Sequence, residues 1–164
     1  MTTEISIRPL DPDDNQSKSM CAQIMASSEP WVTLGRSRDE VLDILADPIS
    51  ESYLFISDGT TIGFAIIIMS GAWVGYIRSI VIKPKYRNRG FGTRIIKELE
   101  TKIFSRFPNV FLSVSSFNSK AKKWYQKMGY EEIGELKDYV IPGHSEFIMR
   151  KTIGSLQGFK GRSN

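Results

Sequence analysis

One short segment near the middle of the chain has the composition of an anion-binding turn: Arg87-Asn88-Arg89-Gly90-Phe91-Gly92-Thr93. It lies between a β-rich run and an amphipathic run, and should therefore open a helix, where the first backbone amides have no partner within the helix. Glycines let a ligand approach this backbone closely, and the helix dipole and the arginines favour negative charge. A pyrophosphate group fits such a turn, because it offers several acceptor oxygens within a short span.

The glycine spacing argues against two common nucleotide sites. The Gly-x-Gly-x-x-Gly pattern of dinucleotide folds and the Gly-x-x-x-x-Gly-Lys pattern of nucleoside triphosphatases are both absent from the sequence. By spacing alone, the segment could also be an ordinary glycine-rich turn, so its context must decide.

The elements before the turn follow from periodicity and from cap signals. Asp13 or Asn15 can cap a first helix, and Ser37 with Glu40 forms a capping box that opens a second helix over residues 41–46. Four β-rich runs in this half predict strands over residues 5–9, 53–57, 62–69 and 73–82.

After the turn, the apolar period changes from two to about 3.6 residues, which predicts a helix packed on a sheet around Ile95 to Phe104. Residues 110–116 follow as a buried strand, so the strand before the turn, this helix and this strand should form a βαβ unit with parallel strands. The last expected elements are a helix over residues 119–127 and strands over residues 130–140 and 146–151.

Length and composition indicate one globular domain. The chain has 164 residues, of which 41% are hydrophobic and 24% charged; we expect a single domain over residues 1–153 and a disordered tail over residues 154–164. No apolar run approaches the ~20 residues of a membrane span. Residues 1–14 do not resemble a secretory signal, and the single cysteine, Cys21, cannot form an internal disulfide. We therefore expect a cytoplasmic protein without a membrane partner, with Cys21 as a buried helix residue.

The formal charge of +4 is concentrated in two short clusters, residues 83–94 and 120–127. Local basic clusters in an otherwise balanced chain are more typical of a site for a small polyanion than of a surface for duplex DNA. We do not expect a nucleic-acid partner. Either cluster taken alone could also be a solvated charged face.

Two motifs in this order resemble those of the GNAT N-acetyltransferase family. The turn supplies the first, and the second, one helix and one strand later, comprises Asn118, Ala121, Tyr125, Gly129 and Tyr130. The resemblance implies an α/β fold with a mixed, mostly antiparallel central sheet, a central parallel strand pair splayed to bind acetyl-CoA, and helices on both faces. The C-terminal half is similar to ribosomal-protein-type N-terminal acetyltransferases.

The resemblance also implies which residues hold the acetyl-CoA co-substrate, and it implies no metal. The strand before the turn would pair its backbone with the pantetheine arm, while its side chains would be core in any case. Asn118 would contact the cofactor, or could equally cap the helix that follows. The predicted cofactor-binding residues are Ile80, Val81, Ile82, Arg87, Asn88, Arg89, Gly90, Phe91, Gly92, Thr93 and Asn118.

Tyr125 matches the family position whose hydroxyl faces the sulfur of coenzyme A. A phenol with an ordinary pKa of ~10 is protonated at neutral pH and can donate to the departing thiolate. The resemblance therefore predicts Tyr125 as the general acid. The alternative is a tyrosine that only packs against the sheet.

The general base does not follow from the sequence. Many relatives carry a glutamate near position 78, where this chain has Arg78. The possible alternatives are Glu29, Asp138, His144, Glu146 or a water chain that drains to solvent.

The expected reaction is transfer of the acetyl group of acetyl-CoA to a primary amine, by direct attack on the thioester in a ternary complex. The acceptor could be a peptide N-terminus, a lysine or a small-molecule amine, and Trp31 and Tyr139 could form walls of its pocket. A different class of function is a non-catalytic acetyl-CoA sensor or scaffold, for which Arg78 is the best support. The sequence allows a monomer or a homodimer.

Overall fold

The computed structural model describes residues 4–161 of the chain. Helices and strands are interspersed along the chain, with a 3₁₀ turn shortly before the third helix. The elements are β1 (Ile5–Pro9), α1 (Asn15–Ala26), α2 (Arg38–Ala46), β2 (Ser50–Ser57), β3 (Thr60–Ile68), β4 (Tyr76–Ile82), η1 (Pro84–Tyr86), α3 (Phe91–Phe104), β5 (Asn109–Ser115), α4 (Ser119–Lys127), β6 (Glu131–Leu136) and β7 (Glu146–Thr152).

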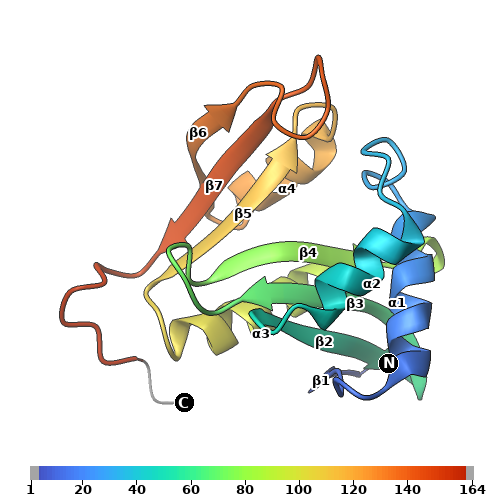
Figure 1. The fold of residues 1–164 in the computed structure, drawn as a ribbon. Coiled ribbons are helices and arrows are strands. Elements are labelled where there is room, and N and C mark those ends of the chain that lie inside the picture. The colour runs from blue at the N-terminus through green and yellow to red at the C-terminus, as the bar shows by residue number, and fades with distance from the viewer. Residues whose placement is uncertain (1–3, 162–164) are drawn as a thin grey trace.

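The strands form one seven-stranded sheet in the order β1-β2-β3-β4-β5-β7-β6 (Figure 1). Every neighbouring pair is antiparallel except β4 and β5, which are parallel and joined through α3. This arrangement confirms the predicted mixed sheet with a central parallel pair and the predicted βαβ unit.

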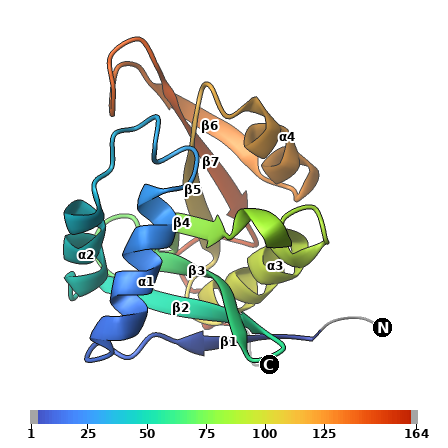
Figure 2. The ribbon, with the colours of Figure 1, turned by 90° about the vertical axis from the view of Figure 1, so that its right-hand side faces the viewer.

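Helices cover both faces of the sheet, which confirms that prediction. Figure 2 shows α1 and α2 on one side of the strands and α3 and α4 on the other. Each pair covers its own apolar core: α1 and α2 pack with Leu54, Phe64, Ile66 and Val81, whereas α3 and α4 pack with the opposite face. Cys21 is fully buried under α2, as expected for a small apolar helix residue.

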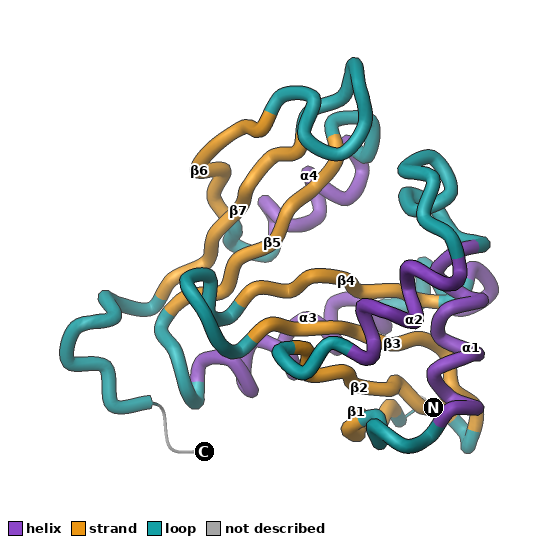
Figure 3. Tube along the Cα trace, viewed as in Figure 1, coloured by secondary structure: helices purple, strands orange, loops and turns teal. Residues whose placement is uncertain are grey.

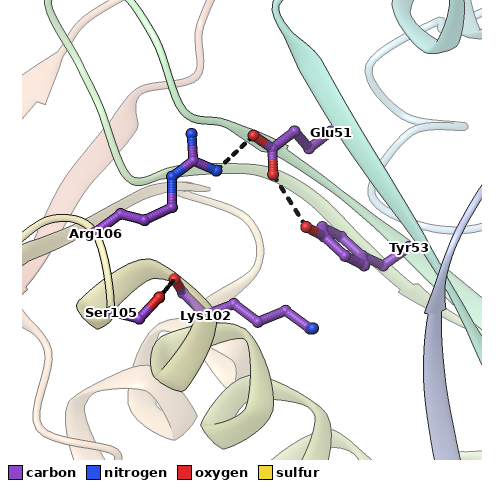
Figure 4. Close-up of polar contacts among 5 residues, drawn as sticks. All are labelled: Glu51, Tyr53, Lys102, Ser105 and Arg106. Atoms are coloured by element: carbon purple, nitrogen blue, oxygen red, sulfur yellow. Dashed lines mark hydrogen bonds and ion pairs between the residues drawn. The ribbon is translucent and has the colours of Figure 1, made fainter. Parts of the chain in front are cut away.

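The C-terminal end of α3 is tied to β2 by a small polar cluster (Figure 4). Arg106, just after α3, donates to Glu51 Oε1 at 2.7 Å, and the hydroxyl of Tyr53 donates to Glu51 Oε2 at 3.0 Å. Lys102 lies 5.1 Å from the centre of the Tyr53 ring. These contacts are half exposed and add about 1 kcal/mol or less each, so they supplement the buried apolar face of α3.

Several predicted boundaries were wrong. The second helix begins at Arg38 and not at residue 41, and β2 begins at Ser50 and not at residue 53. Two further strand ends were wrong because of a local backbone preference. The strand expected over residues 73–82 begins only at Tyr76, because Gly75 has a left-handed φ of 83°. The strand expected over residues 130–140 spans only Glu131–Leu136, since Asp138 turns the chain with a φ of 52°. The first helix is capped by Asp14, whose side chain accepts from the amide of Ser17, and not by Asp13 or Asn15.

The tail was predicted to be disordered over residues 154–164. Its described part, residues 154–161, contains turns and no helix or strand, and residues 162–164 lie outside the described part. Disorder of the tail stays a prediction. None of the helices in the described part of the chain is long and apolar enough to cross a bilayer.

Gly75 offers a test of the junction where β4 meets β5. A Cβ atom added at this position would overlap the carbonyl oxygen of Asn109, in addition to straining a left-handed backbone. We expect Gly75→Ala to lower the free energy of unfolding by about 3 kcal/mol. Gly71→Ala is the matched control, because Gly71 has a similar φ of 82° but open space around it; it should cost only about 1 kcal/mol. Equal losses in urea unfolding would contradict the tight junction.

Candidate active site

The central parallel strands separate shortly after they meet. Within residues 4–161, β4 and β5 pair only at Tyr76 with Phe111 and at Ile77 with Leu112. Directly beyond this point the pairing of β4 with β3 shifts register, leaving Arg78 as an extra residue on β4. Such a bulge bends a strand and increases its twist, so β4 continues along β3 while β5 follows β7 (Figure 1). The predicted splay of the strand pair is confirmed.

The separation leaves backbone groups of β4 directed at the gap. The amide of Lys83 donates to the carbonyl of Ile62 on the β3 side. Because backbone groups alternate sides along a strand, those of Ile80 and Ile82 point the opposite way, towards β5. The carbonyl of Ile82 is reached there by Nε of Arg87, at 2.8 Å.

A cleft of about 1030 Å³ opens at this gap. Its lining includes residues of α3 and α4 and residues of the α1–α2 and β6–β7 loops. Figure 2 shows where the two helices lie, and Figure 3 shows the two loops. Residues from both sides line the cleft, so it passes through the sheet where the strands part.

The predicted anion-binding turn forms one end of the cleft. Gly90 caps α3 in the left-handed conformation, with φ 78°, and a Cβ atom at this position would have no neighbour within 4 Å. The first helical amides after Gly90 therefore border open space, as an anion site at a helix start requires. Gly92 lies against the ring of Trp124, which a Cβ atom would approach to 3.4 Å.

Most of the predicted site residues come together in this cleft. Arg89 and Phe91 do not: Arg89 lies over the ring of Tyr86, and Phe91 is buried in the α3 core. Val81 borders the cleft, but its side chain is core under α1 and α2, as anticipated. The predicted residues on the cleft wall are Trp31, Ile80, Val81, Ile82, Arg87, Asn88, Gly90, Gly92, Thr93, Asn118, Tyr125 and Tyr139.

Tyr125 contributes a buried phenol to the wall. Its ring packs against Trp124 and Tyr130, with centroids 4.7 and 5.5 Å away, and the residue is only 7% exposed. Within residues 4–161, no hydrogen bond reaches its hydroxyl group. Burial raises the pKa of Tyr125 well above its ordinary value, and nearby Tyr76 adds to the rise. The phenol is therefore protonated at neutral pH and has a proton to donate.

The sequence of residues 19–130 matches the family model described as the Acetyltransferase (GNAT) family. The chain belongs to this family. It is a GNAT N-acetyltransferase that uses acetyl-CoA, in agreement with the resemblance of its two motifs.

Individual relatives and solved structures agree with this membership. The chain is 28% identical over 137 residues to the N-alpha-acetyltransferase RimI of Mycobacterium tuberculosis, covering 81% of this chain and 82% of that protein. Its fold is similar to that of the ribosomal-protein-S18-alanine N-acetyltransferase from Escherichia coli, with TM-score 0.73, 18% identity and coverage of 94% and 97%. An aminoglycoside 6'-N-acetyltransferase complexed with coenzyme A is similar at TM-score 0.73, 19% identity and coverage of 92% and 98%.

Asn118 of this GNAT chain is the N-cap of α4, one of the two roles predicted for it. Its side chain accepts from the amide of Ala121 at 3.4 Å and caps α4. The cap helps to position Tyr125, which lies two turns further along the helix. Because Asn118 also borders the cleft, a cofactor contact stays a prediction.

The side chains considered as general bases separate into two groups. Glu29 and Glu146 line the cleft, whereas Asp138 and His144 do not. Asp138 accepts from the amide of Gly143 in its loop, and His144 packs edge-on against Phe117. Arg78, in place of the glutamate of many relatives, faces the cleft and lies 3.9 Å from Asp47.

Sequence reasoning missed several polar side chains on the wall, among them Tyr76 and Ser113. Their hydroxyl oxygens lie 3.1 Å apart, although 37 positions separate them in the chain. No local motif marks them. Their only signal is a polar residue at one face of a buried strand, and the partner depends on how β4 and β5 meet.

The raised pKa of Tyr125 should make the protein less stable in alkali. The unfolded phenol ionises near pH 10 while the folded phenol keeps its proton, so stability present below pH ~10 is lost above it, by about 1.4 kcal/mol per pH unit for one group. Between pH 7 and pH 11, the free energy of unfolding measured in urea should therefore fall by about 1.4 kcal/mol less in Tyr125→Phe than in the parent. Tyr139→Phe is the control for loss of an exposed phenol. An unchanged decline in Tyr125→Phe would contradict a buried, protonated Tyr125.

Proposed function

We propose that this GNAT enzyme transfers the acetyl group of acetyl-CoA directly to a primary amine in a ternary complex, with Tyr125 as the general acid. The observation that carries the proposal is the protonated, buried phenol of Tyr125 on the wall of a cleft that passes between β4 and β5. A phenol without a partner among residues 4–161 is free to donate to the thiolate that leaves when the thioester is cleaved.

The cofactor would enter on the side of α3 and α4. The pyrophosphate would lie at the amides after Gly90, and the pantetheine arm would bond the strand edge at Ile80 and Ile82. The fit is good because Gly90 borders open space and the backbone of Ile80 and Ile82 is directed at the gap. An amide near Ile80 would also polarise the thioester carbonyl oxygen.

The acceptor would enter from the opposite rim, between the α1–α2 and β6–β7 loops. Trp31, packed on the α1–α2 core, and Tyr139, 68% exposed, would form its walls. The likeness to an N-alpha-acetyltransferase over most of both chains supports a peptide N-terminal amine as the first acceptor to test. Two proteins of similar fold are an aminoglycoside 6'-N-acetyltransferase and a spermidine N-acetyltransferase. Small amines therefore belong among the acceptors to test.

Replacement of Tyr125 tests the general acid. We expect Tyr125→Phe to lower kcat by about 100-fold, the lower end of what a positioned acid contributes, with little change in the dissociation constant of coenzyme A. The measurement is free-thiol release from acetyl-CoA across peptide N-termini, lysine peptides, polyamines, amino acids and aminoglycosides. Coenzyme A binding without thiol release on any acceptor would favour the sensor function, and a fully active variant would exclude Tyr125 as the acid.

The phosphate turn can be tested with glycines of matched backbone geometry. Gly90→Ala places a methyl group in the open space that we assign to the pyrophosphate, and should weaken coenzyme A binding by about tenfold or more, the equivalent of about 1.4 kcal/mol. Gly59→Ala is the control, since Gly59 has φ 71° and open surroundings in the β2–β3 hairpin. Both variants carry the same backbone strain, so equal coenzyme A affinity in calorimetric titration would place the phosphates elsewhere.

A further inference from the structure

A buried carboxylate on the acceptor side of the cleft has no part in the chemistry described so far. Glu146 opens β7, is only 6% exposed and lines the cleft. Its Oε1 atom accepts a short hydrogen bond from the hydroxyl of Ser115. Within residues 4–161, Oε2 has no hydrogen bond and no cation pairs with the carboxylate. By contrast Glu100, the other buried glutamate, is paired with Lys151 at 2.7 Å.

The register of the sheet decides which way Glu146 faces. Along β5, Leu112 and Val114 belong to the core under α3 and α4, so Ser113 and Ser115 point to the opposite face. Ser115 is the direct partner of Glu146 on β7, and directly paired residues share a face. Glu146 therefore lies on the acceptor face, whereas Tyr125 reaches the cleft from the α4 face.

Tyr76 lines the same cleft as Glu146 and Tyr125. Its hydroxyl contacts that of Ser113 at 3.1 Å, on the face of Glu146. The pKa of Tyr76 is raised mainly by burial, and the charge of Glu146 adds to the rise. Tyr76 in turn contributes to the raised pKa of Tyr125. Tyr125 and Glu146 thus both interact electrostatically with the hydroxyl of Tyr76, although they belong to opposite faces of the sheet.

The other carboxylates near the cleft are less suited to accept a proton. Glu29 is exposed, and its Oε2 accepts from the amide of Thr33 at 3.3 Å. Asp47 is engaged with Arg78. Among residues 4–161, none of the remaining titratable or cationic side chains that line the cleft is a carboxylate; they are Arg36, Tyr76, Arg78, Arg87, Lys120, Tyr125 and Tyr139.

We propose that Glu146 is the general base of the reaction, in place of the glutamate that relatives carry near position 78; the inference rests on the proposed function. An acceptor that arrives as R–NH₃⁺ gives one proton to Glu146 Oε2, and the neutral nitrogen then forms the C–N bond to the thioester carbonyl carbon. The C–S bond breaks, and the thiolate takes the proton of Tyr125. The surplus proton on nitrogen passes to the tyrosinate, and Glu146 later releases its proton to solvent through the cleft.

The test is Glu146→Gln, which keeps the size of the side chain and an oxygen for the Ser115 hydroxyl. We expect kcat/KM for the acceptor to fall about 100-fold or more at neutral pH, with coenzyme A affinity unchanged. Glu135→Gln is the matched control, because Glu135 lies on β6 away from the cleft and also accepts from a serine hydroxyl, that of Ser145 at 2.6 Å. It should keep the activity of the parent.

Two readouts separate a base from a residue that only holds the fold. Below the pKa of the acceptor amine, the deficit of Glu146→Gln should shrink by about tenfold for each unit by which the pH is raised towards that pKa, because the neutral amine then forms in solution without the enzyme's base. An aminooxy analogue of the same acceptor, whose nitrogen is already neutral, should be acetylated at nearly the parental rate.

Three results would overturn the assignment. They are parental activity with a parental pH profile in Glu146→Gln, an equal loss with the amine and the aminooxy acceptor, and a loss of coenzyme A affinity that accounts for the whole effect. Since the parent is measured in the same assay, failure of the proposed function is distinguishable: the parent itself would then release no thiol with any acceptor, which overturns both proposals.

Discussion

The rest of the structure depends on the short pairing between the two central strands. β4 and β5 share two residue pairs and then part, because Gly75 and Asn109 hold them closely at one end while the bulge at Arg78 turns β4 away. Beyond Ile77 this edge of β4 has no strand partner among the described residues and borders the cleft, where Arg87 bonds the carbonyl of Ile82. An extended ligand can pair with the remaining backbone groups, so the same distortion that interrupts the sheet creates a binding edge.

Parting the strands also joins the two faces of the sheet. In a continuous sheet, side chains from α4 and from the opposite face could not reach one another. Here Tyr125 approaches from the α4 face, while Tyr76, Ser113 and Glu146 belong to the other. A proton donor and a proton acceptor of the protein can thus lie on opposite sides of one reacting centre. Acetyl-CoA and the amine can enter the cleft by separate routes.

Helix α3 links the two ends of this arrangement. Its N-terminus forms the turn at Gly90, and its C-terminal end is held to β2 through Arg106 and Glu51. In its C-terminal half, the partly buried ion pair of Glu100 with Lys151 ties it to β7, the strand that carries Glu146. The position of the turn relative to the acceptor side therefore depends on contacts made far from the cleft.

The sequence by itself determined the features that depend on residues close together in the chain. The glycines and arginines at 87–92, the capping box of Ser37 and Glu40, and the helical span of α4 were all readable because each depends on neighbours a few residues away. Strand ends at Tyr76 and Leu136 were misplaced, because single left-handed residues ended the pattern. Only the tertiary structure decided that Glu146 lies beside Ser115, that Tyr76 meets Ser113 and that Asp138 and His144 stay outside the cleft. These relations depend on strand order and register, which bring distant residues together and which no short stretch of sequence encodes.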